Sequence, residues 1–437
     1  MGSISINFHV NAAQQFKEMV SEPTPNTKLY LAYGRITPWS NEASPDTANS
    51  SVATVYSVWQ NMIGAKKITE NDLRFAIPRY NWSSNTTYIA YDHRNPNLFQ
   101  TNTQFYVLTS DYRVYKCLAN NNSQPSTVEP TAINPNNTTQ TADGYIWKFM
   151  YELSDQDLLR FTTDDYIPIR QVDTDDGSLQ WDVQQGAVSG SIQTIVVDSA
   201  GTNYSSNTTV AISGDGSGAI ATATINTSSN TVTSVIVTDP GQDYTYATVT
   251  FSDTTGSGAS ASAIISPPGG HGSNPIFELG ASHVIINSRL VQDESGVFPT
   301  TNDFRQIALI DNPLVYDESD VASNTAYFQG LTIATTGSGD FTQDEYIYQG
   351  ASLVSATFKG RVISWNANTG IVTTLSNEGT PASGSLTGAN SAVVRYLTSS
   401  TREGLAKYSG DMLYTDNIVP VTRSSDQTES FNIVLHF

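Results

Sequence analysis

The chain has 437 residues, of which only 14% are charged, and its formal net charge at pH 7 is −20. An acidic surface repels phosphate groups, so this composition argues against a nucleic-acid-binding protein. The single cysteine, Cys117, excludes an intrachain disulfide and a cysteine-based metal site. The basic pair Lys66 and Lys67 either ends a helix, where cations are stabilised, or binds a phosphate, and we favour the helix end.

The N-terminal part of the chain predicts strands separated by loops that contain short helices. A helix is expected over residues 11–20, and a strand follows at residues 29–33. The clearest helical spacing covers residues 52–63, with Ser51 as the N-cap and Gly64 as the C-terminal stop.

Alternating apolar residues continue this pattern toward residue 185. Residues 105–108 and 113–118 predict a hairpin, and residues 145–153 predict another strand. Ser154 then begins a capping-box pattern that predicts a short helix through Leu159.

The middle of the chain contains an internal duplication. Residues 195–204 (IVVDSAGTNY) are similar to residues 235–244 (VIVTDPGQDY), and the same spacing separates two GSGA segments, at 216–219 and 256–259. Each copy predicts a strand, a glycine turn, a tyrosine, a strand, a Gly-Ser-Gly turn and a strand. The duplicated unit carries no titratable cluster, which indicates a scaffold and not a catalyst.

Composition also divides the chain into segments. No lysine or arginine occurs between Arg170 and Arg289, and a second β-rich stretch of low charge contains a predicted hairpin at residues 360–375. We therefore expect an N-terminal core part at 1–185, an inserted duplicated β-module at 186–268, a core continuation at 269–326, a second inserted β-module at 327–400 and C-terminal core strands at 401–437.

The sequence offers no constellation typical of catalysis, cofactor binding or metal binding. There is no phosphate-binding loop and no Gly-x-Ser-x-Gly elbow. The glycines at 214–219 precede a strand pattern, which favours a turn over a dinucleotide site, and the acidic loop at 173–177 lacks the glutamate that closes a calcium loop. His271, between glycines, is either a ligand or base, or a hydrogen-bonded side chain in a tight connection, and we favour the second interpretation.

Two loops combine arginine with tryptophan. Arg35 and Trp39 lie close together in one expected loop, as do Arg79 and Trp82 in another. Arginine and aromatic residues are enriched at protein–protein interfaces, but they also stack to hold a loop on its own core. These four residues are the candidate interface, and the sequence leaves both interpretations open.

Several segments together resemble one family, the baseplate wedge subunits of contractile-tailed bacteriophages. The segments that carry the resemblance are residues 31–40 (LAYGRITPWS), 76–82 (AIPRYNW), 143–151 (DGYIWKFMY), 304–314 (FRQIALIDNPL), 408–414 (YSGDMLY) and 426–429 (DQTE).

The resemblance implies a layered β-sandwich with a few short helices in its loops, to which the β-modules are added. It also implies a homodimer that docks to other wedge proteins in the virion tail baseplate, without catalysis or cofactors. Such a part assembles in the host cytoplasm, and the absence of a secretory signal and of a membrane-spanning run agrees with this.

Two other functions remain open on the sequence. Tyr204 and Tyr244 occupy equivalent positions in the two copies and could present paired rings to a carbohydrate, as in a receptor-binding module. An acidic glycosidase is the third alternative, because paired carboxylates such as Asp164 and Asp165 are present.

Overall fold

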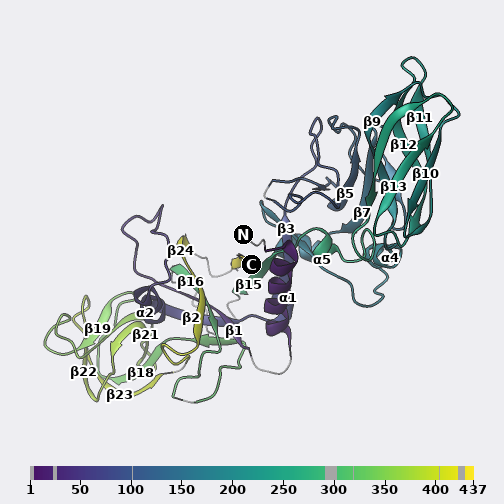
Figure 1. The fold of residues 1–437 in the computed structure, drawn as a ribbon. Coiled ribbons are helices and arrows are strands. Elements are labelled where there is room, and N and C mark those ends of the chain that lie inside the picture. Colours follow the sequence, from purple (N-terminus) through teal and green to yellow (C-terminus); the bar gives the residue numbers. More distant parts are fainter. Residues whose placement is uncertain are drawn as a thin grey trace. The chain divides into compact units, whose positions relative to one another are not determined.

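The structure is a computed structural model that describes residues 4–22, 27–100, 102–290, 303–317, 319–402, 404–421 and 429–437. Strands dominate and the helices are few, so the prediction of a mainly β chain is confirmed (Figure 1). The chain divides into two compact units. The first unit contains Met1–Gln14, Arg74–Ile285 and Val434–Phe437, and the second contains Gln15–Leu73 and Ile286–Ile433.

Two helices begin at the caps that the sequence predicts. α2 (Val52–Asn61) follows Ser51, and α3 (Asp155–Phe161) follows Ser154; in both, the serine Oγ accepts a backbone N–H of the first turn. The first helix begins earlier than predicted. The other helices are α1 (Ile6–Ser21), α4 (Leu179–Gln185) and α5 (Pro275–Glu278), with a 3-10 turn at Glu70–Asp72.

The predicted end of the second helix is wrong. The helix stops at Asn61, and β2 (Met62–Lys67) follows at once, with Gly64 opposite Tyr33 of β1 (Leu29–Gly34). A Cβ at position 64 would lie 2.7 Å from the Tyr33 hydroxyl, so the glycine permits close packing and does not cap a helix. The neighbouring lysine pair also lies in this strand, because pairing with β1 overrides the local helix signal.

The first unit contains an antiparallel sheet of order β4-β5-β7-β6. Its strands are β4 (Tyr106–Leu108), β5 (Arg113–Asn120), β6 (Thr138–Gln140) and β7 (Tyr145–Glu152), and β4 and β5 form the predicted hairpin. The core beside it is strongly aromatic and includes Tyr115, Trp147 and Phe149. Cys117 is part of this core, and burial raises the pKa of its thiol, which makes it unreactive.

A second four-stranded sheet has the order β25-β15-β3-β8. Its strands are β3 (Leu73–Pro78), β8 (Tyr166–Ile169), β15 (His283–Leu290) and β25 (Glu429–His436). Ala76, Phe161 and Ile285 are fully buried together and link this sheet to α3.

The duplicated segments form one six-stranded sheet of order β10-β13-β14-β9-β12-β11. The first copy supplies β9 (Ile192–Thr202), β10 (Thr209–Gly214) and β11 (Ser217–Asn226), and the second supplies β12 (Thr231–Gln242), β13 (Ala247–Ser252) and β14 (Ser257–Ile265). The copies interleave, because β9 pairs with β14 and β12 pairs with β11. Neither copy is therefore a separate sheet.

The two tyrosines of the repeat fix this interleaving. Tyr204 of the first copy covers Gly256 of the second, where an added Cβ would lie 2.4 Å from the ring. Tyr244 of the second copy covers Gly216 of the first in the same way, at 2.5 Å. The tyrosines are 4% and 5% exposed, so they are core residues.

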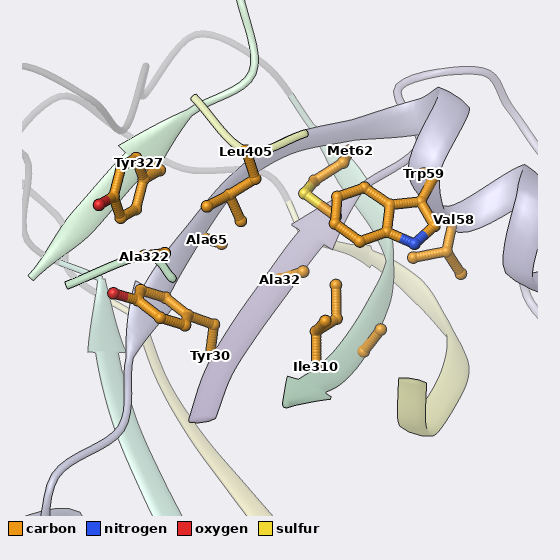
Figure 2. Packing of buried hydrophobic residues seen from close by; sticks show 11 residues of the cluster. Tyr30, Ala32, Val58, Trp59, Met62, Ala65, Ile310, Ala322, Tyr327 and Leu405 are labelled. Atoms are coloured by element: carbon orange, nitrogen blue, oxygen red, sulfur yellow. The ribbon is translucent and has the colours of Figure 1, made fainter. Parts of the chain in front are cut away.

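The second unit contains a five-stranded sheet of order β17-β2-β1-β16-β24. The strands not yet named are β16 (Phe304–Asp311), β17 (Ala326–Phe328) and β24 (Asp411–Val421). Figure 2 shows how Val58 and Trp59 of α2 pack beside Ala32 and Ile310 on this sheet. Helix and sheet thus share one core.

A closed barrel of order β18-β21-β20-β19-β22-β23 completes the second unit. Its strands are β18 (Leu331–Thr336), β19 (Tyr346–Gln349), β20 (Phe358–Asn366), β21 (Ile371–Gly379), β22 (Gly384–Gly388) and β23 (Val394–Arg402). The predicted hairpin at residues 360–375 is confirmed as β20 and β21. Closure leaves the barrel without open sheet edges.

Candidate functional site

Arg35 and Trp39, the first candidate interface pair, stack on each other at the end of β1. The Arg35 Cζ lies 3.6 Å from the centroid of the Trp39 ring, and the Arg35 N–H donates to the Asn61 carbonyl. The Trp39 Nε1–H donates to the Ile418 carbonyl of β24 at 3.1 Å. Both side chains are half-buried, so the pair fastens its own loop to the sheet and leaves only part of each side chain at the surface.

Arg305, which the sequence did not single out, holds the same loop. Its Nε lies 3.0 Å from both carboxylate oxygens of Glu42, and its Nη1 donates to the Ile36 carbonyl at 3.2 Å. The Arg361 side chain of the barrel donates to this carbonyl at 3.4 Å. These residues come from separate strands, and no sequence spacing relates them to the loop.

Arg79 and Trp82, the second pair, belong to the first unit. Arg79 Nη1 donates to the Thr163 carbonyl at 2.9 Å, and Trp82 Nε1 donates to the Ser126 hydroxyl at 3.2 Å. Trp82 also packs against the aromatic core beside β5 and β7. Each pair is therefore tied to its own unit, and an interface role for all four residues stays a prediction.

A buried ionic cluster, formed by Lys116, His271 and Glu278, lies in the first unit. The Lys116 Nζ of β5 lies 2.5 Å from Glu278 Oε2 of α5 and 3.1 Å from His271 Nδ1. His271 Nδ1 lies 3.2 Å from the same carboxylate oxygen, and the Gly272 N–H donates to Glu278 Oε1. The Tyr91 ring covers the lysine, with its centroid 3.8 Å from Nζ. The cluster thus joins the strand β5, the helix α5 and the glycine-rich connection that leads from the repeat to α5.

Burial and mutual attraction set the protonation states of this cluster. Burial disfavours the carboxylate, but Lys116 and His271 outweigh it and lower the pKa of Glu278 to about 2. Burial and the Lys116 charge lower the pKa of His271 to about 4, so this imidazole is neutral at pH 7. Burial also lowers the pKa of Lys116, against the attraction of Glu278.

The cluster is built for structure and not for reaction. Lys116 is completely buried, and Glu278 and His271 are only 6% and 4% exposed. Each charged group is already paired, and the hydrogen bonds of the cluster within the described part of the chain join Lys116, His271, Glu278 and the Gly272 N–H without a serine, threonine or cysteine nucleophile. The sequence favours a hydrogen-bonded His271, but it could not identify Lys116 and Glu278 as its neighbours, because they lie on distant elements.

Two further properties of the described residues bear on function. They include no group of three or more His, Cys, Asp or Glu side chains arranged to hold a metal ion. No helix among them combines the length and the apolarity needed to cross a membrane.

Sequence comparison relates the N-terminal part of the chain to a known family. Residues 2–133 match the family model described as bacteriophage T4 Gp8. The first third of the chain is similar to Gp8. A curated relative, the baseplate wedge protein gp8 of Enterobacteria phage T4, is 23% identical over 187 residues. This match covers 35% of the chain and 56% of the T4 protein, so the chain spans little more than half the length of that relative. The resemblance to baseplate wedge subunits is thereby confirmed.

Three of the segments that carry the resemblance to baseplate wedge subunits lie together in one sheet of the second unit. Residues 31–40 include the end of β1, which pairs with β16, and β16 contains most of residues 304–314. β16 in turn pairs with β24, which continues from residues 408–414. The two later segments lie beyond the part matched by the Gp8 model, and β16 pairs directly with β1 of the matched part in the same sheet. Residues 426–428 lie outside the described part of the chain.

Proposed function

We propose that this protein is a structural component of a phage tail baseplate wedge and acts as a scaffold that docks neighbouring wedge proteins. The observation that carries the proposal is the similarity of residues 2–133 to Gp8, whose T4 member is a baseplate wedge protein. Its location would then be the virion tail baseplate.

The internal construction of the chain suits a scaffold. Each unit contains hydrophobic cores of its own, which keep surface positions in fixed geometry. The buried ionic cluster is satisfied internally and offers no reacting group. We therefore propose a protein without enzymatic activity and without a cofactor.

The carbohydrate alternative loses the feature that suggested it. Tyr204 and Tyr244 are buried against the glycine turns of the opposite copy and cannot present their rings to a sugar. The scaffold is therefore favoured over a carbohydrate-binding or receptor-binding module.

We extend the proposal to self-association and to the candidate interface. The chain would form a homodimer, in which symmetric contacts use the same surface twice. The exposed parts of the loops that carry Arg35, Trp39, Arg79 and Trp82 would contact neighbouring subunits. Their arginine and tryptophan content supports this role.

Gradient sedimentation of the native protein from its source lysate tests the scaffold. We expect it to sediment with a very large particle, together with other tail proteins in fixed ratio, when fractions are analysed by mass spectrometry. Recovery only as a small free species without tail proteins would refute the proposal.

A further inference from the structure

One side of α2 exposes aromatic and apolar side chains to solvent. Trp59 points into the core, as Figure 2 shows, whereas Val52 and Tyr56 are 65% and 49% exposed. The Tyr56 ring contacts Tyr408 edge to face, with centroids 4.9 Å apart, and Tyr408 is 48% exposed. We call Val52, Tyr56 and Tyr408 the aromatic patch. Exposed tyrosines that support each other are typical of binding surfaces.

The backbone holds Tyr408 in a strained conformation. Its φ of +66° lies in the left-handed region, which bulky residues rarely adopt. The turn is fixed by Ser409, whose Oγ accepts the Leu314 N–H at 2.9 Å and donates to the Ala406 carbonyl at 2.6 Å. Strain of this kind concentrates at functional positions, which is a second reason to assign binding to this surface.

Two cations lie beside the aromatic patch, at a small hollow. Arg402 and Lys407 line this hollow of about 20 Å³ together with Gln60, which lies one turn after Tyr56 on α2. Amide groups of Gln329 and Asn377 complete its polar lining. A space of this size holds one small polar group and no bulky ligand.

The hollow carries an excess of positive charge among the described residues. The Arg402 Cζ lies 5.5 Å from the centroid of the Tyr316 ring. Burial of the Lys407 side chain lowers the pKa of Lys407, and the nearby Arg402 charge lowers it further. Glu378 acts on Lys407 with the opposite sign, but its carboxylate pairs with Lys359 at 3.0 Å and is 71% exposed. Among the described residues that line the hollow there are two cations and no carboxylate, although the chain as a whole has a net charge of −20.

We propose that the aromatic patch and the Arg402–Lys407 hollow form the docking surface for an acidic segment of a neighbouring baseplate protein. An aspartate or glutamate of that segment enters the hollow, and apolar residues beside it cover Tyr56 and Tyr408. Charge complementarity selects this partner, and the size of the hollow suits a carboxylate. The inference rests on the proposed function and adds the surface and the chemistry of its partner.

Zero-length cross-linking of purified tail particles tests the contact directly. A carbodiimide joins an amine to a carboxylate only when the two touch, so Lys407 should couple to an aspartate or glutamate of another baseplate protein. Peptide mass spectrometry identifies the two residues. Coupling of Lys407 to a second copy of this chain would refute a different baseplate protein as the partner and would indicate self-association. Coupling only within the chain would refute docking at this surface.

Variants separate the surface from the fold. The double variant Arg402→Gln, Lys407→Gln should reduce incorporation into particles at least tenfold in competition with the unaltered protein, and high salt should reproduce the loss. Arg94→Gln with Arg170→Gln removes two cations that are each 47% exposed in the first unit, and should have no effect. Equal incorporation of both double variants would overturn the proposal.

The aromatic part has its own matched test. Tyr408→Gly removes the ring while it relieves the positive φ, so the protein should fold and yet bind about 30-fold more weakly, as at a central interface residue. Tyr246→Ala removes a tyrosine that is 62% exposed in the first unit and should bind normally. Normal binding by Tyr408→Gly would refute the aromatic contact. Absence of the unaltered chain from particles would instead refute the proposed function.

Discussion

Removal of the Glu278 charge should strongly destabilise the first unit. Glu278→Gln keeps the shape of the side chain but leaves the Lys116 ammonium, which is completely buried, without its counter-charge at 2.5 Å. Loss of one member of a buried ion pair costs about 3–5 kcal/mol. We expect a loss of this size in the free energy of unfolding at pH 7.

The pH dependence of stability reports the same interaction in a second way. The pKa of Glu278 is about 2 in the folded chain and 4.5 in the reference state, so the carboxylate contributes stability above pH 4.5 that is lost as the pH falls toward 2. This difference corresponds to about 3 kcal/mol. The pKa of His271 is lowered from 6.5 to about 4, so the neutral imidazole contributes stability above pH 6.5 that is lost as the pH falls toward 4. This effect has the same sign as that of Glu278, and because the two groups interact, their contributions do not simply add.

Hydrogen exchange across a urea series is the suitable assay, because the chain has two units and one global transition is not expected. Peptides that contain β5 and α5 report the local free energy of opening. Glu278→Gln should accelerate their exchange at pH 7 and flatten the pH dependence below pH 4.5.

Two variants serve as controls for this prediction. Glu152→Gln removes a surface carboxylate, 42% exposed, that pairs with Arg113 beside the same sheet, and should cost less than about 1 kcal/mol. The double variant Lys116→Met, Glu278→Gln should lose less than the sum of its parts. A loss for Glu278→Gln no larger than for Glu152→Gln would refute the assignment of the cluster as a structural clamp.

Substitutions at four other positions test the remaining assignments. Tyr204→Ala empties a core site, so it should lower the free energy of unfolding of the repeat by about 3–5 kcal/mol in urea unfolding. Tyr246→Ala removes an exposed ring and should change that free energy little. Equal effects of the two variants would contradict the interleaved packing. Trp39→Ala and Trp82→Ala should weaken particle assembly more than thermal stability, and an equal loss of both would show that these rings serve only their own loops. The buried Glu345 carboxylate accepts three backbone N–H groups, so Glu345→Gln should destabilise the barrel by about 1–3 kcal/mol, as measured by hydrogen exchange. Unchanged exchange in the barrel strands would contradict that role.

The sequence by itself determined the features that depend on neighbouring residues. The serine caps of α2 and α3, the hairpins and the mainly β character follow from side-chain hydrogen bonds and periodicity within a few residues. The duplication was visible because its two copies share strand and turn residues at one spacing. Residues 2–133 also carry enough local pattern for the Gp8 similarity.

The tertiary structure decided what depends on contacts between distant residues. Gly64 entered a strand because pairing with β1 outweighs a local helix stop. Tyr204 was buried because the other copy supplies Gly256 beneath it, and a sequence scan cannot separate that role from an exposed ring. Lys116 and Glu278 met only through the fold of the first unit, as did Tyr56 and Tyr408 in the second. Caps and turns depend on a few neighbouring residues, so the sequence predicts them. Burial and charge pairing depend on residues that are far apart in the chain, so only the tertiary structure reveals them.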